Sequence, residues 1–142
     1  MTPLHSPLQG LSIKYLADTG QLMSFNNKLS RWFGWLPLGK VASISAAHAA
    51  QHAADYLWID VRTRMEFEKS HIPGAISMPL HSLNSDKINT LPRNKPVICI
   101  CLSAHRSKPA TRQFIKAGFD AQELKGGMLT WWKLKLPLEQ QQ

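Results

Sequence analysis

The sequence has little cysteine: its 142 residues include only Cys99 and Cys101. Two cysteines cannot build a disulfide framework. In an extended strand their Cα atoms would lie roughly 6.6 Å apart, near the limit for a direct bridge. A disulfide-stabilised secreted scaffold is therefore excluded. Free thiols in a reducing compartment are the simpler interpretation, and we expect a cytoplasmic protein.

Several other features are missing. No run of about 18 apolar residues occurs, so we expect no transmembrane helix. The first twenty residues lack the basic start and apolar run of a secretion signal, and we expect none. No Gly-rich phosphate loop or dinucleotide fingerprint is present. Among the histidines only His48 and His52 have a metal-ligand spacing. No acid or cysteine flanks that pair, so we expect no metal site.

Acidic residues are scarce as well, with 9 Asp and Glu against 17 Lys and Arg and a net charge of +8. The excess is concentrated in residues 91–142, which hold nine basic residues and three acids. A positive field of this kind attracts anions. No basic run long enough for a nucleic-acid tail and no nucleic-acid motif accompanies it, so we do not expect nucleic-acid binding.

From residue 41 onward, short apolar segments alternate with segments of helical character. The expected strands are 41–44, 56–60, 76–78, 96–101 and 119–124. The expected helices are 45–54, a brief one capped by Thr63 with Glu66 as its capping-box partner, 107–117, and one after Gly126 and Gly127, and we expect a helix or helical turns over 82–91. Such alternation predicts an α/β domain at 41–138, with a parallel sheet covered by helices on both faces. Residues 139–142 are expected to form a tail.

Residues 1–40 are expected to be an N-terminal extension. Apolar residues recur at three- and four-residue steps over 22–36, which predicts an amphipathic helix. Lys28 and Arg31 lie in this segment. The helix either packs on its own domain or contacts a membrane surface or a partner through its basic and apolar faces.

The most apolar expected strand ends at Cys101, where ligands of parallel sheets bind. The loop that follows consists of Leu102, Ser103, Ala104, His105, Arg106 and Ser107. Its small and polar residues allow the backbone to curl so that N–H groups point inward, and the next helix adds its positive N-terminus. Both features, together with the charge of Arg106, Lys108 and Arg112, favour an anion at the loop centre. We therefore predict that Cys101 is a nucleophilic thiolate, whereas Cys99 inside the strand is an inert core residue.

Four segments, at 58–62, 71–75, 101–107 and 126–131, resemble in order the signature blocks of the rhodanese-homology domain family. The resemblance covers residues 41–138 and implies an α/β fold with a parallel five-stranded sheet. It also implies a sulfurtransferase. Cys101 would take sulfane sulfur from a small sulfur-containing anion such as thiosulfate or 3-mercaptopyruvate, hold it as a persulfide, and pass it to cyanide, a thiol or a protein acceptor. Residues 102–107 would bind the substrate, and no metal or organic cofactor is implied.

The loop length separates two chemistries that the resemblance brings with it. Four residues lie between Cys101 and Arg106, as in the sulfurtransferases, whereas the related phosphatases have a loop one residue longer. The family commonly has a basic residue where this chain has Leu102 and glycine where it has Ala104, which fits less easily if φ is positive. These departures leave the donor open. The alternative is a catalytically weak binding or regulatory module of the same fold.

The resemblance also implies structural roles outside the loop. The Asp60 carboxylate, next to Arg62, is expected to tie loops together through charge-assisted hydrogen bonds. Apart from the resemblance, His71 precedes Ile72, Pro73 and Gly74 in a turn and is expected to serve the backbone. Trp131 and Trp132 are expected to anchor the last helix in the core, with one of them as an alternative residue of the active-site rim. The oligomeric state stays open.

Overall fold

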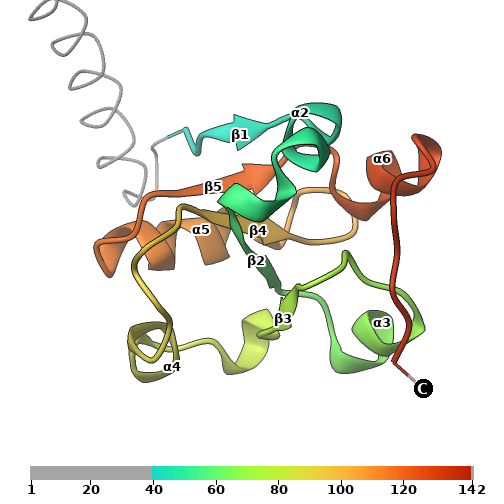
Figure 1. The fold of residues 1–142 in the computed structure, drawn as a ribbon. Coiled ribbons are helices and arrows are strands. Elements are labelled where there is room, and N and C mark those ends of the chain that lie inside the picture. The colour runs from blue at the N-terminus through green and yellow to red at the C-terminus, as the bar shows by residue number, and fades with distance from the viewer. Residues whose placement is uncertain (1–39, 142) are drawn as a thin grey trace, which may run out of the picture. The chain divides into compact units, whose positions relative to one another are not determined.

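The structure is a computed structural model that describes residues 40–141. Five strands form one sheet (Figure 1): β1 (Ser43–Ile44), β2 (Leu57–Asp60), β3 (Ile76–Ser77), β4 (Val97–Ile100) and β5 (Ala121–Leu124). The α-helices are α2 (Ala46–Gln51), α3 (Arg64–Lys69), α4 (Ser85–Asn89), α5 (Ser107–Lys116) and α6 (Gly127–Lys133). Two 3₁₀ turns, η2 (Ala53–Asp55) and η3 (Leu80–Ser82), complete the list.

The sheet has the strand order β1-β5-β4-β2-β3, and every pair is parallel. Strand β4 lies at the centre, between β5 and β2. All four of its residues are buried, as expected of a strand with helices on both sides. The predicted α/β fold with a parallel five-stranded sheet is confirmed.

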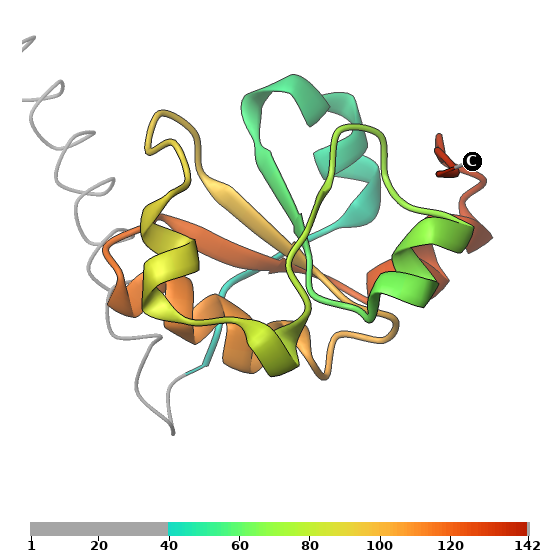
Figure 2. The ribbon, with the colours of Figure 1, turned by 90° about the horizontal axis from the view of Figure 1, so that it is seen from below.

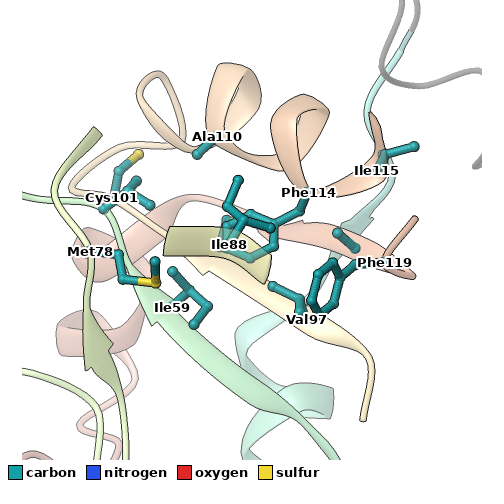
Figure 3. Close-up of a cluster of buried hydrophobic side chains, with 12 residues drawn as sticks. Ile59, Met78, Ile88, Val97, Cys101, Ala110, Phe114, Ile115 and Phe119 are labelled. Carbon is teal, nitrogen blue, oxygen red and sulfur yellow. The ribbon is translucent and has the colours of Figure 1, made fainter. Parts of the chain in front are cut away.

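Helices cover both faces of the sheet (Figures 1 and 2). Two clusters of buried side chains fill the space between the sheet and these helices. Successive residues of β4 point to opposite faces and so divide between the clusters. The cluster under α4 and α5, drawn in Figure 3, contains Ile59, Val61, Met78, Ile88, Val97, Cys99, Cys101, Ala110, Phe114, Ile115, Phe119 and Ala121. The cluster under α2 and α6 contains Ile44, Ala46, Ala49, Trp58, Ile72, Ile98, Ile100, Leu124, Met128 and Trp131.

The predicted capping box at the start of α3 is confirmed. The Thr63 side chain accepts a hydrogen bond from the Glu66 N–H at 3.3 Å, and the Thr63 N–H donates to the Glu66 carboxylate at 2.9 Å. Because these bonds satisfy N–H groups that have no partner inside the helix, they fix where α3 begins.

One predicted helix is shorter in the structure. The helix expected at 45–54 leaves α-geometry after Gln51, and η2 follows with the Ala53 carbonyl bonded to the Trp58 indole N–H at 2.9 Å. The helix or helical turns expected at 82–91 correspond to the short helix α4, which η3 precedes. The Asn84 side chain accepts a hydrogen bond from the Lys87 N–H and caps α4. The sequence analysis did not consider Asn84 as a cap.

The two ends of the chain differ in how far the structure describes them. The predicted helix at 22–36 lies outside the described residues and stays a prediction. At the other end, Glu139 of the expected tail exchanges two backbone hydrogen bonds with His71, at 2.9 and 2.8 Å. Within residues 40–141, none of the helices has the length and apolarity needed to cross a bilayer.

A buried ion pair closes the end of β2. The Arg62 guanidinium donates to both carboxylate oxygens of Asp60, with the shortest contact at 2.7 Å, and also to the Ser70 carbonyl at 2.7 Å. Both side chains are almost fully buried. The pair therefore joins the end of the strand to the segment after α3, in agreement with the structural role expected for Asp60.

We predict that Asp60→Asn lowers the free energy of unfolding by about 3–5 kcal/mol, because it leaves the Arg62 guanidinium buried without its counter-charge. Urea unfolding measures the change. Asp86→Asn in the exposed first turn of α4 is the control and should cost less than about 1 kcal/mol. Equal effects of the two substitutions would contradict the structural role of the pair.

Candidate functional site

The candidate loop, residues 101–107, leaves the central strand at its carboxyl end and leads into α5. The start of α6 holds the first part of this loop. The Met128 N–H donates to the Cys101 carbonyl at 2.8 Å, and the Leu129 N–H donates to the Leu102 carbonyl at 3.1 Å. Gly127 has a φ of +58°, and a Cβ at this position would collide with both carbonyls. Glycine is therefore required for the close approach of α6 to the loop.

The Cys101 thiol is buried, with 1 % of the residue exposed, and it points toward the start of α5 (Figure 3). The sulfur donates a hydrogen bond to the Ser107 hydroxyl oxygen at 3.4 Å. The Ser107 hydroxyl donates in turn to the Glu123 carboxylate at 3.0 Å. The two ends of the predicted loop are thus brought together, and a buried acid of β5 joins them.

Glu123 has a second partner, the ammonium group of Lys108. The Lys108 Nζ lies 2.9 Å from the carboxylate and also donates to the Ala104 carbonyl at 2.9 Å. Glu123 is almost completely buried, whereas the Lys108 side chain is about half exposed. Lys108 therefore both neutralises the acid and fastens the middle of the loop to α5.

Arg106 is paired as well. Its guanidinium makes a two-pronged contact with the Glu66 carboxylate, with both hydrogen bonds at 2.8 Å. This contact holds the pKa of Glu66 at about 2 and raises the pKa of Arg106. The sequence analysis expected Arg106 and Lys108 to add positive charge to the loop, but each of these cations lies against a carboxylate.

The remaining loop residues have separate positions. Leu102 packs against the cluster under α2 and α6. The Ser103 hydroxyl and the Nδ1 atom of His105 form a hydrogen bond at 3.0 Å, and both residues are exposed. Ala104 has a φ of +67°, the left-handed conformation that the sequence analysis considered for this position. The backbone N–H groups of residues 102–106 donate no hydrogen bond to another described residue.

The two cysteines lie in different surroundings although both are free. Cys99 is fully buried inside β4, and burial raises the pKa of its thiol to about 12. It therefore stays protonated at neutral pH, as expected of an inert core residue. Cys101 lies directly after the last residue of β4, and its sulfur is hydrogen-bonded to Ser107 at the other end of the loop.

Sequence reasoning missed two residues of this site. It assigned Glu66 a capping role only, although the same carboxylate also binds Arg106. It did not consider Glu123 at all. The sequence signal was the acid Glu123 in a short, otherwise uncharged strand. The structure buries all four residues of this strand, Ala121–Leu124. A buried charge requires a partner, and β5 lies beside the strand that ends at Cys101.

Comparisons with known proteins give one consistent result. Residues 43–134 match the family model described as a rhodanese-like domain. A protein of Allochromatium vinosum named sulfurtransferase is 28% identical over 102 residues, which are 71% of this chain and 94% of that protein. The adenylyltransferase and sulfurtransferase UBA4 of Meyerozyma guilliermondii is 32% identical over 87 residues, 56% of this chain but only 20% of that protein. The chain thus spans a small part of some relatives and nearly the whole of others.

Two further similarities point the same way. The putative sulfur carrier protein YrkF of Bacillus subtilis is 41% identical over 61 residues, 43% of this chain and 32% of that protein. The crystal structure of a rhodanese-related protein from Thermoplasma volcanium superposes with a TM-score of 0.65 at 28% identity, over 69% of this chain and 97% of that one.

The ion pair of Glu66 and Arg106 predicts a pH dependence of stability. Because the pKa of Glu66 falls from 4.5 to about 2 in the folded state, its contribution is complete above about pH 4.5 and is lost as the pH falls toward 2. We predict that Glu66→Gln, which can still cap α3, flattens the fall in unfolding free energy between those pH values. Urea unfolding across the range measures this. Glu68→Gln, which removes a more exposed ion pair with Arg64, should leave the slope near that of the wild type.

Ala104 supplies a second prediction. The left-handed conformation costs an alanine about 1 kcal/mol, and glycine adopts it without that cost. We predict that Ala104→Gly raises the free energy of unfolding by about 0.5 kcal/mol, since part of the gain is offset by the greater freedom of glycine in the unfolded chain. Ala117→Gly at the end of α5, where φ is −79°, is the control and should not stabilise. A loss of stability in Ala104→Gly would show that the loop gains nothing from glycine.

Proposed function

Because the chain belongs to the rhodanese-like domain family, we propose that it is a sulfurtransferase that carries sulfane sulfur as a persulfide on Cys101. The observation that carries the proposal is the position of this thiol. It lies at the carboxyl end of the central strand, in a loop that continues into the ten-residue helix α5. The names of the relatives, sulfurtransferase and putative sulfur carrier protein, support the same chemistry. Both cysteines are free, which suits the reducing conditions of the cytoplasm.

In the first half of the proposed reaction, the Cys101 thiolate attacks the outer sulfur of the donor. A sulfur–sulfur bond forms on Cys101. The bond between the transferred sulfur and the rest of the donor breaks. Its electron pair leaves with sulfite if the donor is thiosulfate, with the enolate of pyruvate, which water then protonates, if the donor is 3-mercaptopyruvate, and with the donor's thiolate if the donor is a protein persulfide. In the second half, a thiolate or cyanide attacks the outer sulfur of the persulfide and restores the Cys101 thiolate. No net oxidation or reduction by a third reagent is required.

The backbone of the loop supplies the proposed stabilisation of negative charge. The N–H groups of residues 102–106 donate to no other described residue, so they remain available to a donor or a persulfide. The N-terminus of α5 adds about half a positive charge. These groups are fixed before the reaction begins, which is the condition under which hydrogen-bond donors accelerate a step that develops charge.

The ion pairs of the loop bear on the choice of donor. Arg106 is balanced by Glu66 and Lys108 by Glu123, so a dianion such as thiosulfate meets less free positive charge than the sequence suggests. Leu102 adds apolar surface in place of a further cation. We propose that donors of lower charge, such as 3-mercaptopyruvate or a protein persulfide, are used in preference to thiosulfate.

The test is the intact mass of the protein after incubation with each donor. We predict an increase by one sulfur atom that cyanide removes, that is absent in Cys101→Ser, and that persists in Cys99→Ala, because Cys99 is protonated and buried. A larger labelled fraction with 3-mercaptopyruvate than with thiosulfate at equal concentration is expected. If no donor adds sulfur to folded protein, the sulfurtransferase proposal fails and a binding module of the same fold becomes the better interpretation.

A further inference from the structure

A single hydroxyl hydrogen lies between Cys101 and Glu123. Ser107 is fully buried and its side chain contacts both residues, accepting from the sulfur at 3.4 Å and donating to the carboxylate at 3.0 Å. A serine hydroxyl has only one hydrogen to donate. As long as that hydrogen binds Glu123, Ser107 can only accept from Cys101. The sulfur must then supply the hydrogen of that bond itself.

The Glu123 carboxylate and the Cys101 sulfur compete for the hydroxyl hydrogen of Ser107, and the carboxylate is the stronger acceptor as long as the thiol is uncharged. Hydrogen bonds to a carboxylate are stronger than those between neutral groups, and the site excludes water from the carboxylate. Glu123 is 5 % exposed and Ser107 is not exposed at all. The Lys108 Nζ lies 2.9 Å from the other oxygen of the Glu123 carboxylate, where it balances the charge and holds the carboxylate in place.

The other charges near the sulfur do not reverse this preference. The guanidinium of Arg106, a loop cation, is held by Glu66. Asp60 is bound to Arg62 on the neighbouring strand. Burial is the main cause of the raised pKa of Cys99 on β4, and the charge of Glu123 adds to it.

We propose that Glu123 is a positioning residue that keeps Cys101 in the thiol form at rest by occupying the only hydrogen of Ser107. This inference rests on the proposed function, because it concerns the nucleophile assigned there. When the thiolate or persulfide forms, the Ser107 hydroxyl rotates to donate to the sulfur. The Glu123 carboxylate keeps its contact with the Lys108 Nζ. The thiol proton passes to water, and the electron pair stays on the sulfur. The resting thiol is thereby protected from electrophiles that do not enter the loop as a donor does.

The test is the rate at which iodoacetamide alkylates Cys101, because only the thiolate reacts. In Glu123→Gln the amide can donate to the Ser107 oxygen and free its hydrogen for the sulfur. We expect the rate at pH 7 to rise about tenfold, and the pH of half-maximal rate to fall by about one unit. Cys99 does not contribute to the signal, since its thiol stays protonated throughout this range.

Two further variants separate the hydrogen bond from charge. Glu123→Asp keeps the negative charge opposite Lys108 but withdraws the carboxylate from Ser107 by one methylene, so it too should accelerate alkylation. In the Ser107→Ala background, Glu123→Gln should change the rate by less than about twofold, since no hydroxyl remains to be released. Glu68→Gln, an exposed acid on α3, is the control for the loss of one negative charge and should alkylate like the wild type.

The proposal is overturned if folded Glu123→Gln and Glu123→Asp both alkylate at the wild-type rate. It is also overturned if Glu123→Gln accelerates alkylation equally with and without the Ser107 hydroxyl, because the carboxylate would then act by its charge alone. If Glu123→Gln does not fold, Glu123→Asp decides the question. Alkylation requires no sulfur donor. A chain that fails to gain sulfur but shows these rates would disprove the proposed function and leave this inference standing.

Discussion

The two hydrogen bonds from the start of α6 to the carbonyls of Cys101 and Leu102 are the contact on which the geometry of the loop depends. Strand β4 is fixed on both sides by its parallel neighbours, so its last residue is fixed by the sheet. Beyond that point α6 determines the direction in which the chain leaves the strand. The left-handed conformation of Gly127 brings the N–H groups of α6 within reach of those carbonyls. Gly127 therefore serves the loop even though it lies 20 residues after Ser107, the last residue of the loop.

The opposite side of the loop is held by ion pairs that also decide its charge. Arg106 reaches α3 through Glu66, and Lys108 reaches β5 through Glu123. Each pair fixes part of the loop and at the same time removes a free positive charge from it. In the proposed reaction, the described loop then stabilises an anion through its backbone N–H groups and the N-terminus of α5. Backbone N–H groups are uncharged hydrogen-bond donors. They stabilise a small change in charge on one atom better than they bind a highly charged group.

The sequence predicted most of the fold, because its signals were local and consistent with one another. The apolar residues of 96–101 and the capping box of Thr63 and Glu66 each specify their own element, and the structure has both. The element boundaries that differed depend on single side chains, such as the Asn84 cap of α4. The candidate loop was identified from its own residues. Its partners were not, because Glu66 and Glu123 lie 40 and 16 residues from the loop residues that they bind. Spacing along a single sequence carries no information about such pairings.

The number of basic residues in the sequence overstated the free positive charge around Cys101. Residues 91–142 have a large excess of basic residues, and the excess suggested a cationic loop around Cys101. Charged groups in a partly buried loop, however, require counter-charges or solvent, and here two of the cations have carboxylate partners. The reactivity of a cysteine in such a loop is governed less by the number of nearby cations than by which atom holds each shared hydrogen. In this chain that hydrogen belongs to Ser107, and the buried acid on β5 competes with the sulfur for it.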